Sequence, residues 1–177
     1  MAYTYRAATT NTVVAAADTT AFFVISGSAG ATRRVRKIRV SGSTLTTLAV
    51  GSVVAQKRST AQTGGTATEL TRVPVNSVFP AAQTDGLVQV YTGAPTDGTL
   101  VGTLACRRHV WKSATVVDAP FADLEFDFDN KEDSRGGQLG IALHGVAQSV
   151  TLAFGAAPAT AITLAVEVEW TEDLSGR

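Results

Sequence analysis

The alternation of apolar and polar side chains in two segments is the feature that most restricts how this chain can fold. Residues 162–171 are apolar at every second position, and residues 121–129 alternate leucine and phenylalanine with carboxylates. A strand points successive side chains to opposite faces, whereas a helix would scatter these apolar residues around its circumference. Both segments are therefore predicted as strands with one buried face. The predicted buried residues are Leu124, Phe126, Phe128, Ile162, Leu164, Val166, Val168 and Trp170.

Turn signals separate several shorter candidate strands. Residues 21–26 form a continuous apolar run, which predicts a strand buried on both faces. In the basic segment that follows, the apolar residues Val35 and Ile38 are three positions apart instead of two. This break in the alternation predicts a β-bulge near Arg36 and Lys37. Further strands are expected at 45–57, 86–91, 99–107, 138–144 and 149–154. Many short strands between Gly- and Pro-containing turns predict an all-β fold, a β-sandwich or jelly roll with eight or more strands and little helix.

The length of 177 residues fits one domain. Residues 21–177 carry the strand pattern and are predicted to form a single β-sandwich domain. Residues 1–20 are rich in Ala and Thr and contain few large apolar groups. Chain ends are often disordered unless they are tied down, so this segment is predicted as an extended N-terminal arm or a loosely held first strand.

Composition excludes several classes of protein. Hydrophobic residues make up 45% of the chain and charged residues 17%, which excludes a highly charged disordered protein. No apolar run approaches the ~20 residues that span a bilayer, and no signal peptide is expected at the start. The single cysteine, Cys106, rules out an internal disulfide framework. The formal net charge of zero disfavours direct nucleic-acid binding.

No catalytic set is predicted. Cys106 and His109 have a C-x-x-H spacing, but a zinc site needs three or four ligands and no further Cys or His lies nearby. Cys106 is predicted to face the core as a small apolar residue. We expect no catalytic residue, no cofactor and no metal, and we predict that the protein is not an enzyme.

The acidic run from Asp127 to Asp133 has one alternative interpretation, a calcium-binding loop. Lys131 stands where such a loop has an oxygen ligand, and Glu132 stands where it has glycine. These departures favour an acidic strand face that runs into a solvated turn, and cation binding stays open as the alternative.

Charge is segregated along the chain. Up to Lys112 there are twelve Lys or Arg against four Asp or Glu, a balance of +8, and the remainder has three against eleven, a balance of −8. The densest part is a basic cluster that we consider a candidate interface. It consists of Arg33, Arg34, Arg36, Lys37 and Arg39. Such cations cannot all be buried without partners. They are predicted to pair with Glu125, Glu167 and Glu169 in the same chain or with an acidic surface on another protein. Phosphate contact is disfavoured because no aromatic residues for base stacking lie nearby.

Four segments carry a resemblance to a known class of proteins. They are residues 27–44 (GSAGATRRVRKIRVSGST), 56–71 (QKRSTAQTGGTATELT), 98–104 (GTLVGTL) and 166–172 (VEVEWTE). In this Ala-, Thr- and Gly-rich pattern the chain resembles small β-sandwich virion proteins of tailed bacteriophages, which include head decoration proteins, fibre bases and minor tail components. The resemblance is one of general residue pattern and extends over most of the chain after about residue 20. It implies no catalytic residues.

The resemblance implies a structural accessory protein of the virion, a head decoration or minor capsid subunit that binds the particle by protein–protein contacts. The implied partners are the major capsid protein or fibre and tail proteins. A homo-oligomer assembled in the cytoplasm of the bacterial host is expected. The alternatives are a tail or fibre-base protein and a carbohydrate-binding or adhesin module. For a carbohydrate module, the candidate sugar contacts are Trp111, Tyr91, Tyr3 and Tyr5.

Overall fold

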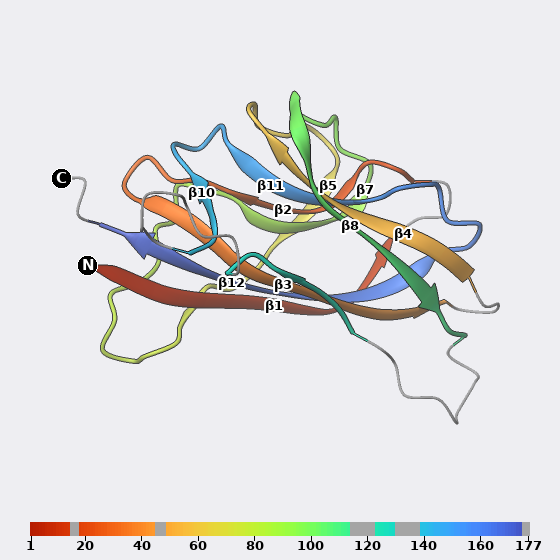
Figure 1. The fold of residues 1–177 in the computed structure, drawn as a ribbon, viewed down its shortest axis with the longest axis horizontal. Helices are drawn as coiled ribbons and strands as arrows, with labels where there is room; N and C mark the ends of the chain where they lie inside the picture. Colours follow the sequence, from red (N-terminus) through yellow and green to blue (C-terminus); the bar gives the residue numbers. More distant parts are fainter. Residues whose placement is uncertain (15–17, 45–48, 114–122, 130–138, 175–177) are drawn as a thin grey trace.

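The computed structural model describes residues 1–14, 18–44, 49–113, 123–129 and 139–174. These residues form twelve β-strands in two antiparallel sheets that pack face to face, and they contain no helix (Figure 1). The predicted all-β sandwich with eight or more strands and little helix is therefore confirmed. Within this part of the chain, no helix has the length and apolar character needed to cross a membrane.

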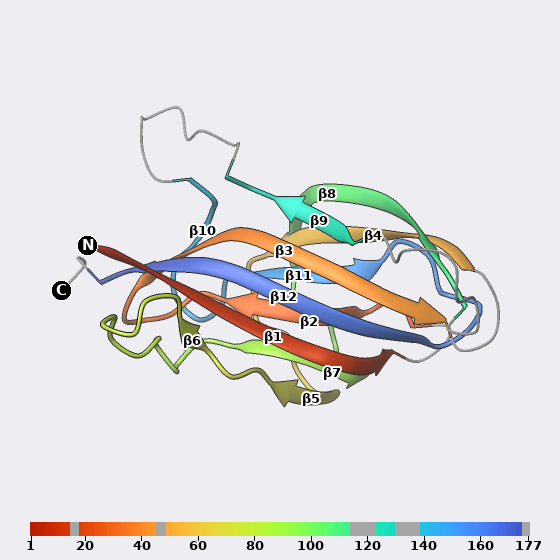
Figure 2. The same ribbon diagram turned by 90° about the horizontal axis from the view of Figure 1, so that it is seen from below.

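The first sheet has the strand order β10–β3–β12–β1–β6, and β9 also pairs with β3 (Figure 2). Its strands are β1 (Ala2–Val14), β3 (Thr32–Thr44), β6 (Val73–Pro74), β9 (Leu124–Asp127), β10 (Ile141–Leu143) and β12 (Ile162–Asp173). One edge of β3 pairs with β12 along its length. The other edge of β3 pairs with β10 near Arg33 and with β9 near Arg39.

The second sheet has the strand order β5–β7–β2–β11–β4–β8. Its strands are β2 (Ala21–Ser26), β4 (Ala49–Arg58), β5 (Thr66–Glu69), β7 (Val88–Gly93), β8 (Leu100–Trp111) and β11 (Ser149–Phe154). Strands β5 and β6 had no counterpart among the expected strands, because short polar and small residues give little periodic signal. β1 corresponds to the first strand that was the alternative to an extended arm. The expected strands at 45–57 and 138–144 lie partly outside the described residues.

The hydrophobic core fills the space between the sheets. Burial along β12 alternates residue by residue, as its sequence pattern predicts. All eight residues predicted to be buried from the two alternating segments are buried. The aromatic rings of Tyr5 and Trp170 stack with centroids 5.9 Å apart, and those of Phe126 and Phe128 lie 6.5 Å apart. The Tyr5–Trp170 contact therefore joins β1 to β12, and the Phe126 and Phe128 rings are buried in the same core.

Two strands of the second sheet are buried on both faces. Every residue of β2 and of β11 is buried, which confirms the prediction made for residues 21–26. On the outer face, Arg58 Nε donates to Thr151 Oγ1 at 3.4 Å, and Arg58 Nη2 contacts Asp97 Oδ2 at 2.9 Å. The segment that contains Asp97 thus lies over the middle of this sheet and shields it from water.

The N-terminal residues belong to the first sheet. Ala2–Val14 pairs with β12 along one edge, and part of its other edge pairs with β6, so it is not an extended arm (Figure 2). Tyr5 is fully buried, and its hydroxyl donates to Pro80 O at 3.0 Å. The backbone of β12 needs a partner on the side away from β3, and β1 satisfies its hydrogen bonds there.

Strand β3 contains the predicted bulge. Lys37 pairs with Glu169 and Val35 pairs with Trp170, so Arg36 has no opposite residue in β12. An extra residue in one strand reverses the facing of every residue beyond it. As a result, Ile38 faces inward on one side of the bulge, and Val35 and Arg33 face inward on the other side.

Candidate functional site

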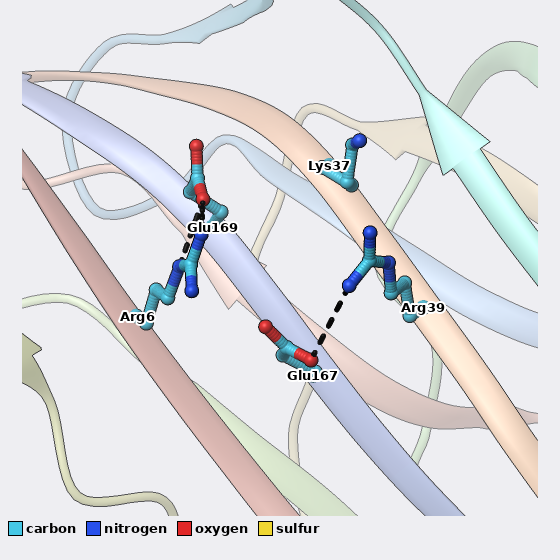
Figure 3. Close-up of a pocket in the computed structure, with 5 residues that line it drawn as sticks. All are labelled: Arg6, Lys37, Arg39, Glu167 and Glu169. Atoms are coloured by element: carbon cyan, nitrogen blue, oxygen red, sulfur yellow. Dashed lines mark hydrogen bonds and ion pairs between the residues drawn. The ribbon is translucent and has the colours of Figure 1, made fainter. Parts of the chain in front are cut away.

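The outer surface of the first sheet carries a set of charged side chains that we call the charged face. It consists of Arg6 on β1, Glu167 and Glu169 on β12, Lys37 and Arg39 on β3, and Glu125 and Asp127 on β9. The inward neighbours of these residues along each strand are apolar, so period two places the charged residues outward. The sign of the charge alternates from strand to strand across the sheet. Figure 3 shows Glu167 and Glu169 lying between Arg6 on one side and the β3 cations on the other.

Glu169 pairs with two cations. Its Oε2 atom lies 2.7 Å from Arg6 Nη2, and its Oε1 atom lies 3.3 Å from Arg36 Nη1 (Figure 3 shows the Arg6 pair). Arg36 is the bulged residue of β3, and it also donates from Nε and Nη2 to the two oxygens of Asp129 at 3.0 and 2.7 Å. This hydrogen bonding to Asp129 raises the pKa of Arg36. The bulge thus directs one arginine to two carboxylates, one on β12 and one just after β9.

Glu125 on β9 pairs with the two neighbouring cations of β3. Arg39 Nε donates to Glu125 Oε2 at 2.7 Å, and Lys37 Nζ lies 3.3 Å from Glu125 Oε1. Arg39 Nη1 also lies 4.0 Å from Glu167 Oε2, as Figure 3 shows. The hydrogen bond between Arg39 and Glu125 raises the pKa of Arg39 and lowers the pKa of Glu125. Intrachain pairing, one of the predicted roles of the basic cluster, is therefore observed.

Arg33 does not lie on the surface with the other candidate interface residues. It is fully buried, and its Nε lies 2.9 Å from Oε1 of Glu172, which is also fully buried. Its other nitrogens donate to Ser26 O and Gln83 O. Burial lowers the pKa of Arg33, and the Glu172 carboxylate opposes that shift. The reversal of facing at the bulge explains why Arg33 points inward while Arg34, opposite Thr171, is only partly buried.

Cys106 and His109 do not form a pair. A separation of three residues along a strand places them on opposite faces. Cys106 is exposed, which corrects the prediction that it faces the core. The His109 ring contacts the Trp111 ring with centroids 4.3 Å apart, and burial lowers the pKa of His109. β8 is an edge strand, so its outward positions are not covered as those of β2 and β11 are.

The acidic run is described only as far as Asp129, and residues 130–133 lie outside the described residues. Asp127 Oδ1 accepts a hydrogen bond from Asp129 N at 2.9 Å, and Asp129 pairs with Arg36. In the described ranges, no group of three or more His, Cys, Asp or Glu side chains is placed to hold a metal ion.

Three of the four candidate sugar contacts are buried. Tyr5, Tyr91 and Trp111 are at most 4% exposed, and Tyr3 packs partly buried against Phe79 with ring centroids 5.1 Å apart. A sugar-binding platform needs an exposed aromatic face, so Tyr5, Tyr91 and Trp111 cannot serve as one in this conformation.

A cavity of about 280 Å³ lies at one end of the sandwich, where Ala49–Gly51 of β4 approach Trp111, Phe154 and the turn before β12. Its walls are mostly apolar. Trp111 Nε1 and Thr160 Oγ1 are buried and lack hydrogen-bond partners among the described residues. A buried indole N–H without an acceptor is a cost to stability that the packing of the ring must offset.

The protein is an antiparallel β-sandwich, and the charge on the outer surface of its first sheet alternates in sign from strand to strand. No protein-family model matches the chain, and no curated protein matches it. One solved structure, a chain of the infectious bursal virus-derived T=1 particles, is 13% identical with a TM-score of 0.16. That likeness covers 97% of this chain and 40% of the viral chain. We draw no inference from it, because the two structures superpose so poorly.

Proposed function

We propose that this protein is a structural subunit of a bacteriophage virion, a head decoration or minor capsid protein, and that it binds the particle through the edge of β8. The single observation that carries this proposal is the position of β8 at the end of the second sheet, with one edge that lacks a strand partner among the described residues (Figure 1). Its residues pair with β4 along one edge, and from Ala105 to Trp111 its other edge has no strand partner within the described ranges. Unpaired edges readily accept another strand, so natural proteins usually cover or shorten them.

Exposed apolar side chains accompany this edge. Leu100, Val101 and Val110 on β8 are 50%, 61% and 46% exposed, and Val50 on β4 is 56% exposed beside Val110, its register partner. Single exposed apolar residues are ordinary, but a group along one free strand is typical of an interaction surface. A stable contact buries about 1,200–2,000 Å² in total, which a long strand and its flanks can contribute to.

The charged face is a weaker candidate for the main contact. Arg36, Lys37 and Arg39 are already paired with carboxylates of the same chain, and Arg33 is buried. A partner at this face would have to compete with those intrachain pairs. We therefore assign the particle contact to β8 and give the basic cluster a role in holding β3 between β12 and β9.

The phage context is supported by the Ala-, Thr- and Gly-rich resemblance described from the sequence. A tail or fibre-base position is the second form of the same proposal, since the same edge would contact a tail protein. The carbohydrate-binding alternative is weakened because three of its four candidate contacts, Tyr5, Tyr91 and Trp111, are buried.

The test is co-sedimentation of the purified protein with phage particles assembled without it. We expect saturable binding, weakened by Val101→Glu on β8. The matched control is Val78→Glu, at a residue that is 81% exposed outside the strands, and it should bind as the wild type does. Wild-type protein that does not bind the particles would overturn the proposal. Equal binding by both variants would show that β8 is not the contact. Light scattering of the same samples measures the self-association that we also expect.

A further inference from the structure

We propose that β8 binds an extended acidic segment of a partner protein, which adds to the second sheet as a further antiparallel strand. This inference rests on the proposed function, because it names the chemistry of the partner at the same edge. It is carried by the geometry of the edge, by two arginines on it that form no ion pair with a described residue, and by the absence of carboxylates from β4 and β8.

β8 is longer than the other strands that end the two sheets. The strands β5, β6, β9 and β10 have between two and four residues, whereas β8 has twelve. β1 is also long and pairs with β6 only at Tyr5 and Arg6, but its one cation, Arg6, already has a carboxylate partner. Register shifts interrupt its pairing with β4 near Leu100 and Thr103, but from Ala105 to Trp111 the pairing is continuous. This regular stretch of seven residues is about 23 Å long at roughly 3.3 Å per residue. After it, Lys112 O accepts from Thr44 N at 2.9 Å, which ties the chain to the first sheet.

Two neighbouring arginines lie in the regular stretch. Arg107 and Arg108 are both exposed, and they point to opposite faces because they are adjacent in a strand. Neither forms an ion pair with any described residue. Arg6 and Arg39 on the charged face and the bulged Arg36, in contrast, all have carboxylate partners.

The neighbouring strand supplies no counter-charge. Neither β4 nor β8 contains Asp or Glu, although each contains two cations. A strand that pairs with the free edge places alternate side chains above and below the sheet, so acidic residues at adjacent positions would meet Arg107 on one face and Arg108 on the other. Main-chain hydrogen bonds would supply affinity, and the carboxylates would supply selectivity and register.

A second copy of this chain is a poorer occupant. Antiparallel pairing of two β8 strands would bring four unpaired arginines into one two-stranded ribbon, and like charges across a strand pair are destabilising. The occupant that the charge pattern favours is therefore an acidic segment of another protein of the particle.

The first experiment titrates the full-length protein with a fluorescently labelled peptide, acetyl-Thr-Glu-Val-Glu-Glu-Val-Thr-amide, and follows fluorescence anisotropy. We expect binding that weakens at least tenfold in the Arg107→Ser/Arg108→Ser variant and that is lost when lysine replaces each glutamate of the peptide. The matched control is Arg6→Ser/Arg39→Ser, which removes the same charge from the charged face and should leave binding unchanged. Equal weakening in both double variants would overturn the assignment to β8.

A second measurement separates strand addition from simple charge attraction. The same peptide N-methylated at alternate residues keeps its charge but cannot form the ladder of main-chain hydrogen bonds. We expect it to bind at least tenfold more weakly, and we expect the unmodified peptide to protect the amides of Ala105 to Trp111 from hydrogen exchange. Equal binding of the two peptides, or no added protection, would overturn strand addition.

The co-sedimentation assay distinguishes failure of this inference from failure of the proposed function. Particles that bind wild type and Arg107→Ser/Arg108→Ser equally well would overturn the acidic partner and leave the proposed function standing. Particles that bind neither would overturn the proposed function itself. A dimer of the wild type that the double substitution strengthens would identify a second copy as the occupant and overturn the acidic partner.

Discussion

Arg33 on β3 and Glu172 on β12 form an ion pair in which both side chains are fully buried and Nε lies 2.9 Å from Oε1. The remaining polar atoms of the pair are also engaged: Glu172 Oε2 accepts from Gln83 N at 2.9 Å, and Trp170 Nε1 donates to Oε1 at 3.1 Å. The pair thus connects β3, β12 and the loop that precedes β7. Buried charges are tolerated when they are paired and hydrogen-bonded in this way.

Glu172→Gln should be strongly destabilising. It leaves the Arg33 charge buried without a counter-charge, and breaking a buried pair in this way costs about 3–5 kcal/mol. Urea denaturation measures the loss in the free energy of unfolding. The control is Arg6→Gln, which breaks an exposed pair with Glu169 and should cost less than about 1 kcal/mol. Equal losses in the two variants would contradict the buried location of the Arg33–Glu172 pair.

Phe126→Ala should lower the free energy of unfolding by about 3–5 kcal/mol, because it removes a ring that is only 1% exposed between the two sheets. The matched control is Val101→Ala on the exposed edge strand, which should change stability by less than about 0.5 kcal/mol. Both are measured by urea denaturation. A Phe126→Ala loss below about 1 kcal/mol would mean that this part of the core is not packed as described.

Trp170→Phe and Trp111→Phe should differ in stability although they make the same chemical change. Trp170 donates a hydrogen bond to the buried carboxylate of Glu172, and Trp111 Nε1 has no partner among the described residues. Hydrogen bonds to charged groups contribute about 1.5–3 kcal/mol, so Trp170→Phe should be more destabilising by roughly that amount. Thermal or urea unfolding of the two variants checks this, and an equal loss would contradict the assigned hydrogen bond.

Gly86→Ala should be destabilising, because an added Cβ would lie 2.1 Å from Gly27 O and 2.4 Å from Arg33 Nη1. Relief of this overlap would shift backbone that supports the buried ion pair, at a cost of about 1–3 kcal/mol. Gly102→Ala on β8 is the control, since a Cβ there meets nothing within 4 Å. A melting temperature for Gly86→Ala at or above that of Gly102→Ala would contradict the close approach.

The Glu125 carboxylate should contribute to folding stability at neutral pH and lose that contribution at acidic pH. Its hydrogen bond from Arg39 lowers its pKa in the folded state, so folding favours the carboxylate. The contribution is complete above the usual glutamate pKa of about 4.3 and is lost as the pH falls through the lowered folded-state value. The free energies of unfolding of the wild type and Glu125→Gln should therefore differ by a constant, small amount at neutral pH and become equal in acid. A gap that widens as the pH falls would reverse the sign of the assigned pKa shift.

Local patterns predicted much of the fold. The alternation in β12 and β9 identified their inward faces, because the facing of a side chain depends only on its position along the strand. The step from Val35 to Ile38 predicted the bulge for the same reason. Pairing of the basic cluster with Glu125, Glu167 and Glu169 was among the predicted alternatives, since opposite charges on neighbouring strands attract.

Other features depended on which strands became neighbours. The first residues were expected to be an extended arm or a loosely held first strand. The structure has a strand there, β1, which pairs with β12 along its length and with β6 at Tyr5 and Arg6. Arg33 is buried, unlike the other cations of its segment, because the bulge at Arg36 reverses which residues of β3 face inward. Cys106 was expected in the core, but β8 proved to be an edge strand whose outward face is uncovered.

The sequence by itself determined the β class, the inward face of each strongly alternating strand and the position of the bulge, because these follow from a two-residue period within single segments. Only the tertiary structure decided that Arg33 meets Glu172 across 139 positions of sequence, that cations of the charged face are paired within the chain, and that β8 is a long strand at the end of its sheet, with β4 as its one strand partner among the described residues. Strand order and edges arise from pairing between segments far apart in the chain, and no local pattern encodes which partner a strand will have.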